Sequence, residues 1–114
     1  MKIVFFAFKG DPLCFIHVML NALDLKAEGH TAGIVFEGEA TKLIPELSRD
    51  DHPLVGLYRK IKENHLIEGA CRACSAKMGV LPAVEKEGVP LLDDMAGHPG
   101  MARFLSQGYQ IVTL

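Results

Sequence analysis

The feature that most constrains the fold is an unbroken apolar run near the start of the chain, Lys2-Ile3-Val4-Phe5-Phe6-Ala7-Phe8. A strand with one face in water would alternate apolar and polar residues, and this run does not. Continuous β-favouring residues are typical of a strand that is covered on both faces, as in the middle of a parallel sheet. The run therefore predicts a central strand with other layers on both sides of it.

Strand-like and helix-like segments alternate along the rest of the chain. Asp11 is expected to cap a helix over residues 13–28, with Pro12 at its first position and Gly29 at its end. The other expected strands lie at 31–36, 65–70, 89–92 and 109–113, and the other expected helices at 40–47, 53–64, 81–87 and 99–107. This alternation predicts an α/β fold.

The predicted fold is a three-layer sandwich around a sheet of about five mostly parallel strands, with right-handed crossovers, in a single domain over residues 1–114. One segment allows two interpretations. Residues 65–70 have the composition of a strand, but helical spacing also fits Ile67, Cys71, Cys74 and Met78. Strand and helix therefore both stay open for this segment.

The expected helix at 13–28 is apolar around most of its circumference. One face, which we expect to pack on the sheet, holds Leu13, Ile16, Leu20, Leu23 and Ala27. The apolar surface is then extended by Cys14, Phe15, Val18 and Met19. A helix this apolar is usually buried on more than one side, so we expect a homo-oligomer in which a second copy covers it. A covering loop is the alternative.

The composition excludes several classes of partner. A net charge of −2 gives no basic surface for nucleic acid or for an anionic membrane. The apolar start is too short for a membrane span or a secretion signal, so we expect a cytoplasmic protein. The turn Lys9-Gly10-Asp11 lacks the glycine spacing of nucleotide-binding loops, so no nucleotide cofactor is expected, and the sequence indicates no other.

Two of the three cysteines, Cys71 and Cys74, form a C-x-x-C motif ahead of a short helix-like segment. At a helix N-terminus, the unpaired N–H groups and the helix dipole favour a thiolate, and Arg72 adds positive charge. We therefore expect a lowered pKa at Cys71. An odd number of cysteines in a reducing compartment does not indicate a disulfide framework. Redox, sulfur-transfer and metal chemistry remain as interpretations of the motif.

Ligands of open parallel sheets bind beyond the carboxyl ends of the strands. The segments expected at that edge carry the dithiol together with acids, bases and glycines. Besides the cysteines, the residues expected to line the site there are Lys9, Asp11, Arg72, Asp93, Asp94 and His98.

The cysteine stretch Gly-Ala-Cys-Arg-Ala-Cys, the pair Gly79-Val80 and the tail from Asp93 to Thr113 together resemble the DsrE/DsrF-like family, which is related to the TusD sulfur-relay subunit. The resemblance extends over nearly the whole chain. It implies a flavodoxin-like layered fold, assembly into trimers or hexamers, and a cysteine that carries sulfur as a persulfide. Cys71 takes the position of that cysteine. The second thiol, Cys74, departs from what the relay members need.

The expected function is therefore that of a sulfur carrier or sulfurtransferase, with a sulfur donor and an acceptor protein as partners. Cys71 would hold the persulfide, and Cys74 would be available as a resolving thiol. Exposure of the Cys71 sulfur tests this idea, because a buried sulfur argues against a carrier role for Cys71 in that state.

Three other interpretations remain open. A C-x-x-C at a helix start is also the arrangement of dithiol redox proteins. A zinc site could use Cys71, Cys74, Asp94 and His98, although a single C-x-x-C is a weak signal for one. Free cysteines can also be simple packing residues, in which case the protein would be a non-catalytic oligomeric binding module.

Overall fold

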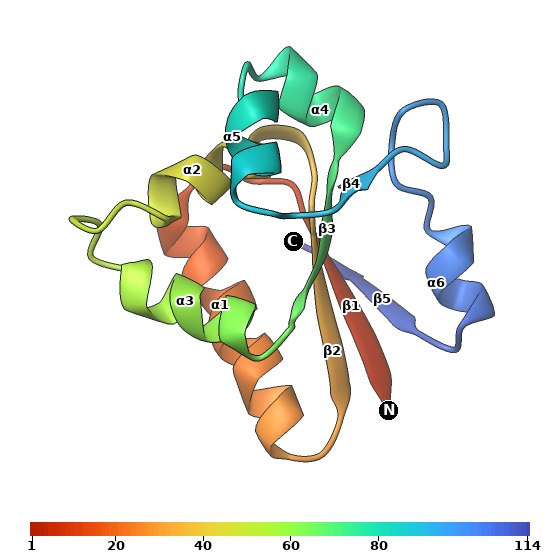
Figure 1. Ribbon diagram of the computed structural model, residues 1–114. Coiled ribbons are helices and arrows are strands. Elements are labelled where there is room, and N and C mark those ends of the chain that lie inside the picture. The colour runs from red at the N-terminus through yellow and green to blue at the C-terminus, as the bar shows by residue number, and fades with distance from the viewer.

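The computed structural model describes residues 1–114 and follows the predicted alternation of strands and helices (Figure 1). The strands are β1 (Lys2–Ala7), β2 (Thr31–Phe36), β3 (Ile67–Cys71), β4 (Leu91–Leu92) and β5 (Gln110–Thr113). The helices are α1 (Pro12–Ala27), the 3-10 helix η1 (Gly38–Lys42), α2 (Leu43–Leu47), α3 (Val55–Glu63), α4 (Arg72–Lys77), α5 (Leu81–Lys86) and α6 (Ala102–Ser106).

The five strands form one sheet in the order β4-β3-β2-β1-β5, and every pairing is parallel. In Figure 1, α1, α2, α3 and α5 lie on one side of the sheet and α6 lies on the other. The predicted α/β sandwich with a five-stranded sheet is therefore confirmed. No helix has both the length and the apolar character needed to cross a membrane.

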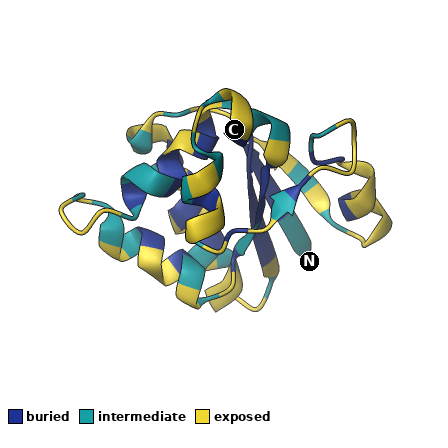
Figure 2. Ribbon diagram, turned by 45° about the horizontal axis from the view of Figure 1, so that its top comes forward, coloured by how far each residue is buried: buried dark blue, intermediate teal, exposed yellow.

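The apolar run of β1 is buried on both faces, as its composition predicts (Figure 2). Phe5 and Ala7 belong to a core of 19 buried residues that extends from the sheet into the larger helical layer. Val4 and Phe6 belong to a second, smaller cluster with Phe104 of α6. The rings of Phe6 and Phe104 meet edge to face, with their centroids 5.6 Å apart. Both layers therefore depend on β1.

Helix α1 buries a different face from the predicted one. The buried residues are Phe15, Val18, Met19 and Ala22, whereas Leu13 and Leu20 are 74% and 48% exposed. The expectation that Leu13 and Leu20 pack inward is therefore wrong. Where a helix is apolar nearly all round, periodicity defines more than one candidate face. Here Phe15 stacks against Phe36 of β2, with 5.0 Å between ring centroids, and this contact lies on the buried face.

Residues 67–71 form a strand, which decides between the two interpretations of this segment. The short helix α4 follows directly, as expected. The helix expected at 99–107 is shorter and covers only 102–106. Asp94 explains part of this difference, because its carboxylate accepts the N–H of Gly100 at 3.2 Å and holds that residue in the preceding loop.

Gly69 allows β3 and β4 to approach each other closely just ahead of the cysteines. A Cβ atom at this position would lie 2.6 Å from Cγ of Leu92 and 2.7 Å from the carbonyl oxygen of Pro90. The same carbonyl accepts the N–H of Ala70 at 2.8 Å, so it cannot move away freely. We predict that Gly69→Ala lowers the free energy of unfolding by about 1–3 kcal/mol, the usual cost of overpacking. Urea denaturation followed by circular dichroism measures this.

Gly56 provides the matched control, because it lies in α3 and a Cβ atom there meets nothing within 4 Å. We expect Gly56→Ala to raise the free energy of unfolding by up to about 1 kcal/mol, since alanine favours helix over glycine. A Gly69→Ala protein as stable as the unmodified chain would contradict the proposed steric contact.

Candidate functional site

Cys71 is the last residue of β3 and the N-cap of α4. Its Sγ accepts the N–H of Cys74 at 3.2 Å, as a capping side chain does. The hydroxyl of Ser75 donates to the carbonyl oxygen of Cys71 at 2.7 Å. These bonds fix the backbone where strand becomes helix. They place Cys71 at the helix end, as predicted, and Cys74 in the first turn of α4.

His98 reaches the cysteines from a tight turn that follows β4. The N–H of Met95 donates to the carbonyl of His98 at 2.8 Å, and the N–H of His98 donates back to that of Met95 at 2.9 Å. The two central residues, Ala96 and Gly97, have φ values of +51° and +89°. Two left-handed residues in a row are typical of a type I′ turn. Ala96 is strained there, because its Cβ disfavours a positive φ.

This turn docks on the start of α4. The N–H of Ala73 donates to the carbonyl of Gly97 at 2.9 Å. A Cβ at Gly97 would lie only 3.3 Å from Cβ of Ala73, so the contact is tight. His98 is thereby fixed beside both thiols.

The resulting cluster joins two sulfur atoms and one imidazole. Nδ1 of His98 lies 3.2 Å from Sγ of Cys71 and 3.8 Å from Sγ of Cys74. The three donor atoms all lie within 4.8 Å of one another. With its ring proton on Nε2, His98 presents Nδ1 as a proton acceptor to either thiol.

Cys71 is completely buried, and its electrostatics differ from the expectation. Burial, together with the neighbouring Cys74 thiol and the Glu37 carboxyl, raises the pKa of the Cys71 thiol to about 12. The backbone N–H of Cys74 at the helix end does favour the thiolate, as expected, but it does not offset the loss of solvent. The expected lowering of the pKa of Cys71 is therefore wrong, because the helix end lies in a water-excluded place.

Glu37 is a site residue that the sequence analysis did not select. It follows β2, is only 8% exposed, and interacts electrostatically with both Cys71 and His98. Burial raises the pKa of its carboxyl, and His98 partly opposes that change. Its position at the carboxyl edge of the sheet was a usable signal, but glutamate is rarely buried and its type alone gives no hint of burial.

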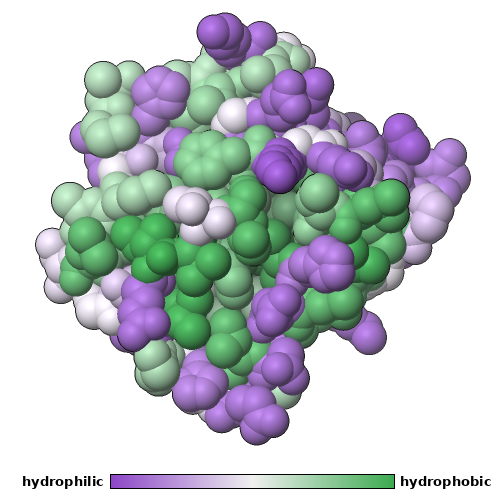
Figure 3. All heavy atoms as spheres, turned by 180° about the vertical axis from the view of Figure 1, so that it is seen from behind, coloured by the Kyte–Doolittle hydropathy of each residue, from purple (hydrophilic) through white to green (hydrophobic).

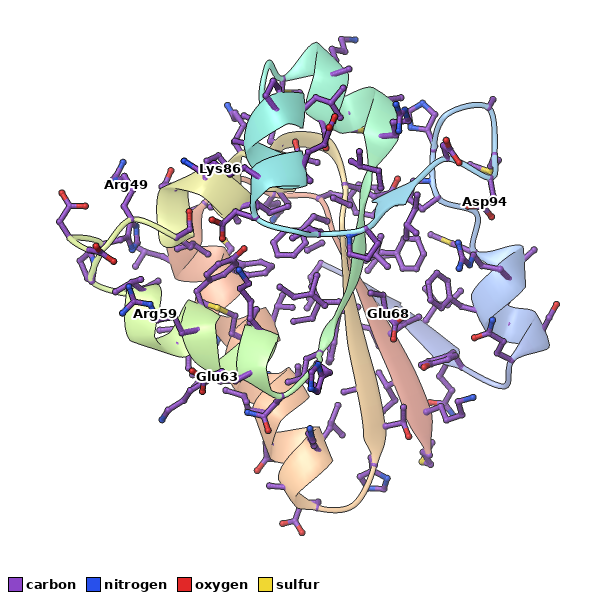
Figure 4. All side chains as sticks on the ribbon, viewed as in Figure 1. Arg49, Arg59, Glu63, Glu68, Lys86 and Asp94 are labelled. Atoms are coloured by element: carbon purple, nitrogen blue, oxygen red, sulfur yellow. The ribbon has the colours of Figure 1, made fainter.

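Of the six residues expected to line the site, His98 joins the cluster and the others have different surroundings. Asp94 projects from the loop between β4 and α6 (Figure 4), where it accepts the Gly100 N–H and lies 3.7 Å from the guanidinium of Arg103. The side chain of Asp11 caps α1 by accepting the N–H of Leu13 at 2.8 Å. Arg72 and Asp93 are exposed.

Lys9 lies in a separate groove, which it lines with Cys14, His17, Thr113 and Leu114 at the end of β5. Asp94 is not one of the residues whose donor atoms converge, so the four-residue metal set reduces to Cys71, Cys74 and His98.

The three cysteines differ in exposure, which predicts their order of reaction with an alkylating reagent. Cys14 is exposed, Cys74 is half-buried and Cys71 is buried. In reduced, chelator-treated protein, diluted far enough to contain single chains, we expect iodoacetamide to label Cys14 first and Cys74 more slowly, and to label Cys71 only on unfolding. Peptide mass spectrometry over time checks this order. The same reaction in concentrated urea should label all three at similar rates, and a native Cys71 that reacts as fast as Cys14 would contradict the burial.

Comparisons with known proteins identify a relative by sequence and a solved structure with a similar fold. The uncharacterized protein MJ0733 of Methanocaldococcus jannaschii is 31% identical over an alignment 120 residues long, which covers all of this chain and 96% of the relative. A solved structure, that of the conserved protein of unknown function BT1422 from Bacteroides thetaiotaomicron, matches with a TM-score of 0.67 over 99% of this chain and 94% of that one. At 18% identity the likeness to BT1422 shows the shared fold alone. No established family profile matches the sequence.

Proposed function

The chain belongs to the same family as MJ0733, and we propose that it carries sulfur as a persulfide on the dithiol of Cys71 and Cys74. The observation that carries this proposal is the convergence of both sulfurs on Nδ1 of His98, at 3.2 and 3.8 Å. Sulfur transfer needs a thiolate nucleophile and a place for its proton, and the cluster supplies both. The resemblance of the cysteine stretch and the tail to DsrE/DsrF-like proteins supports the same chemistry.

The burial of the two thiols assigns them different steps. Cys71 is fully buried, so in this state it cannot reach the sulfur of a donor protein, whereas Cys74 is half-buried. We therefore give Cys74 the first step, which reverses the order expected from the resemblance. His98 takes the thiol proton, and the Cys74 thiolate attacks the outer sulfur of a donor persulfide. The products are Cys74–S–SH and the donor thiolate.

The stored sulfur then has two fates. An acceptor thiolate can attack the outer sulfur, which moves to the acceptor and leaves Cys74 as a thiolate. Alternatively, after the departing donor thiolate has taken the first proton from His98, His98 takes the proton of Cys71. The Cys71 thiolate then attacks the inner sulfur, Sγ of Cys74, which lies within 4.8 Å. That step forms the Cys71–Cys74 disulfide and releases hydrosulfide, and two equivalents of a thiol reductant restore the dithiol. A reduced dithiol requires a reducing compartment, which supports a cytoplasmic location.

The test is a transfer experiment with a persulfide donor, carried out with chelator present and followed by intact mass. We expect the unmodified chain to gain one sulfur atom, which a thiol reductant removes. Cys74→Ser should gain none at the site. Cys71→Ser should retain its added sulfur longer, because no resolving thiol remains.

Cys14→Ser is the matched control, because Cys14 lies on α1 outside the cluster. It should gain and lose sulfur like the unmodified chain. A gain that only Cys14→Ser abolishes would contradict the proposal. So would a loss of two hydrogens without sulfur transfer, which would indicate a dithiol redox protein instead.

We also propose that the protein is a homo-oligomer, with a second copy covering the exposed apolar side of α1. Leu13 and Leu20 project from α1, and Phe8, Val112 and Leu114 are exposed large apolar residues near the ends of β1 and β5. Figure 3, which views the molecule from behind, shows a broad gathering of apolar side chains on that face. Strand β5 is an edge of the sheet, so its outer backbone groups are unpaired within this chain.

Sedimentation equilibrium tests the oligomer. We expect a mass that is a multiple of the 12.5 kDa chain for the unmodified protein. Because both side chains are exposed, Leu13→Glu with Leu20→Glu should give a folded monomer. Glu85→Lys, a change at an exposed residue of α5 away from this face, is the control and should leave the mass unchanged. A monomeric unmodified protein would contradict the proposal.

A further inference from the structure

We propose that Cys71, Cys74 and His98 form a binding site for one zinc ion, with Sγ, Sγ and Nδ1 as the ligand atoms. The inference rests on the geometry of these three donors and does not depend on sulfur transfer. Two thiolates and one imidazole are a donor set that zinc prefers.

The two sulfur–nitrogen distances within the cluster fit the edges of a zinc tetrahedron. With zinc–sulfur bonds of about 2.3 Å and a zinc–nitrogen bond of about 2.0–2.1 Å, sulfur and nitrogen ligands lie roughly 3.6 Å apart. Nδ1 of His98 lies 3.2 Å from Sγ of Cys71 and 3.8 Å from Sγ of Cys74, so the two distances bracket this value. An ion needs only shifts of a few tenths of an ångström in these two separations. The two sulfurs lie within 4.8 Å of each other and would have to be roughly 3.8 Å apart around zinc.

The backbone around the donors is already fixed, so binding would order little of the chain. The N-cap bond from the Cys74 N–H holds Cys71 Sγ in place, and the bond between Ala73 and Gly97 holds the turn that carries His98. Hydrogen bonds therefore join the segments that carry the three ligands to one another. Preorganisation of this kind reduces the entropy lost on binding.

The charges around the cluster also favour a cation. The buried sulfur of Cys71 and the half-buried sulfur of Cys74 meet near the carboxyl of Glu37, which is itself 8% exposed. A divalent ion neutralises two thiolates that burial otherwise disfavours. Binding replaces two S–H bonds with two zinc–sulfur bonds and releases both protons to the solvent. Three protein ligands leave a fourth position for water or for another donor, as in zinc sites that exchange ligands.

The test is equilibrium binding to reduced protein that has first been freed of metal with a chelator. Zinc is titrated against a coloured competing chelator, and cobalt(II) serves as a spectroscopic probe. We expect one ion per chain and a thiolate-to-cobalt charge-transfer band. Because even outer-shell partners of a metal contribute about 10–100-fold in affinity, we expect Cys74→Ser and His98→Ala to weaken binding about 100-fold or more. Cys14→Ser should bind like the unmodified chain.

A second measurement needs no variant at the site. Zinc should protect Cys74 of the unmodified protein from iodoacetamide and leave the labelling of Cys14 unchanged, because only Cys74 belongs to the cluster. Cobalt(II) binding without a thiolate charge-transfer band would overturn the proposal. So would equal protection of Cys14 by zinc, or an unmodified chain that binds no zinc. No persulfide donor is present, so these results are independent of the sulfur-transfer experiment.

Discussion

The candidate site depends on one backbone hydrogen bond, from the N–H of Ala73 to the carbonyl of Gly97. It joins the first turn of α4 to the turn after β4. The sheet topology places these two segments at the same edge of the sheet but does not bring them into contact. Without it, only the side-chain contacts of Cys71, to His98 at 3.2 Å and to the Gly97 carbonyl at 3.9 Å, would relate the turn to the thiols, although Cys71 and Cys74 would still share the start of α4. The left-handed backbone of Ala96 and Gly97 is what aims this carbonyl at the helix. A strained alanine at that place is consistent with a turn selected for position as well as stability.

Burial gives Cys71 and Cys74 different chemistry although they are only three residues apart. The N-terminal end of α4 offers Cys71 the hydrogen bond that normally activates a thiol, yet the absence of water raises the pKa of that thiol to about 12. A buried thiol of this kind is a poor first nucleophile. It is suited to act second, on a sulfur atom that is already beside it. The same placement suits a metal ligand, because a cation supplies the positive charge that solvent does not.

The sequence predicts the fold better than it predicts the site, for physical reasons. Burial on both faces dictates the composition of β1, so the apolar run Lys2–Phe8 specified its surroundings. The inward face of α1 was not predictable in this way, because Leu13 and Phe15 are equally apolar and only the contact with Phe36 separates them. The expectation that ligands bind beyond the carboxyl ends of the strands led to His98, which does lie beside the cysteines. That expectation also included Lys9, because it applies to all strands of the sheet alike. Strand order, which the sequence does not show, places β1 two strands, or about 10 Å, from β3 and so separates Lys9 from the cysteines. Glu37 was missed because burial of an acid depends on tertiary packing.

Sulfur transfer and zinc binding at this cluster exclude each other at any one moment. Each uses a lone pair of Cys74 Sγ, and a bound ion would occupy the sulfur that a donor must reach. If both occur, free zinc and the sulfur donor compete for one reduced dithiol, and the occupancy of the metal sets the fraction of protein open to sulfur. The thiols would then be kept reduced and unreactive until metal leaves, which is a useful state for an accessible cysteine in a cell that contains oxidants. The open fourth position matters to this competition, because an incoming donor persulfide could bind there before either protein sulfur is released.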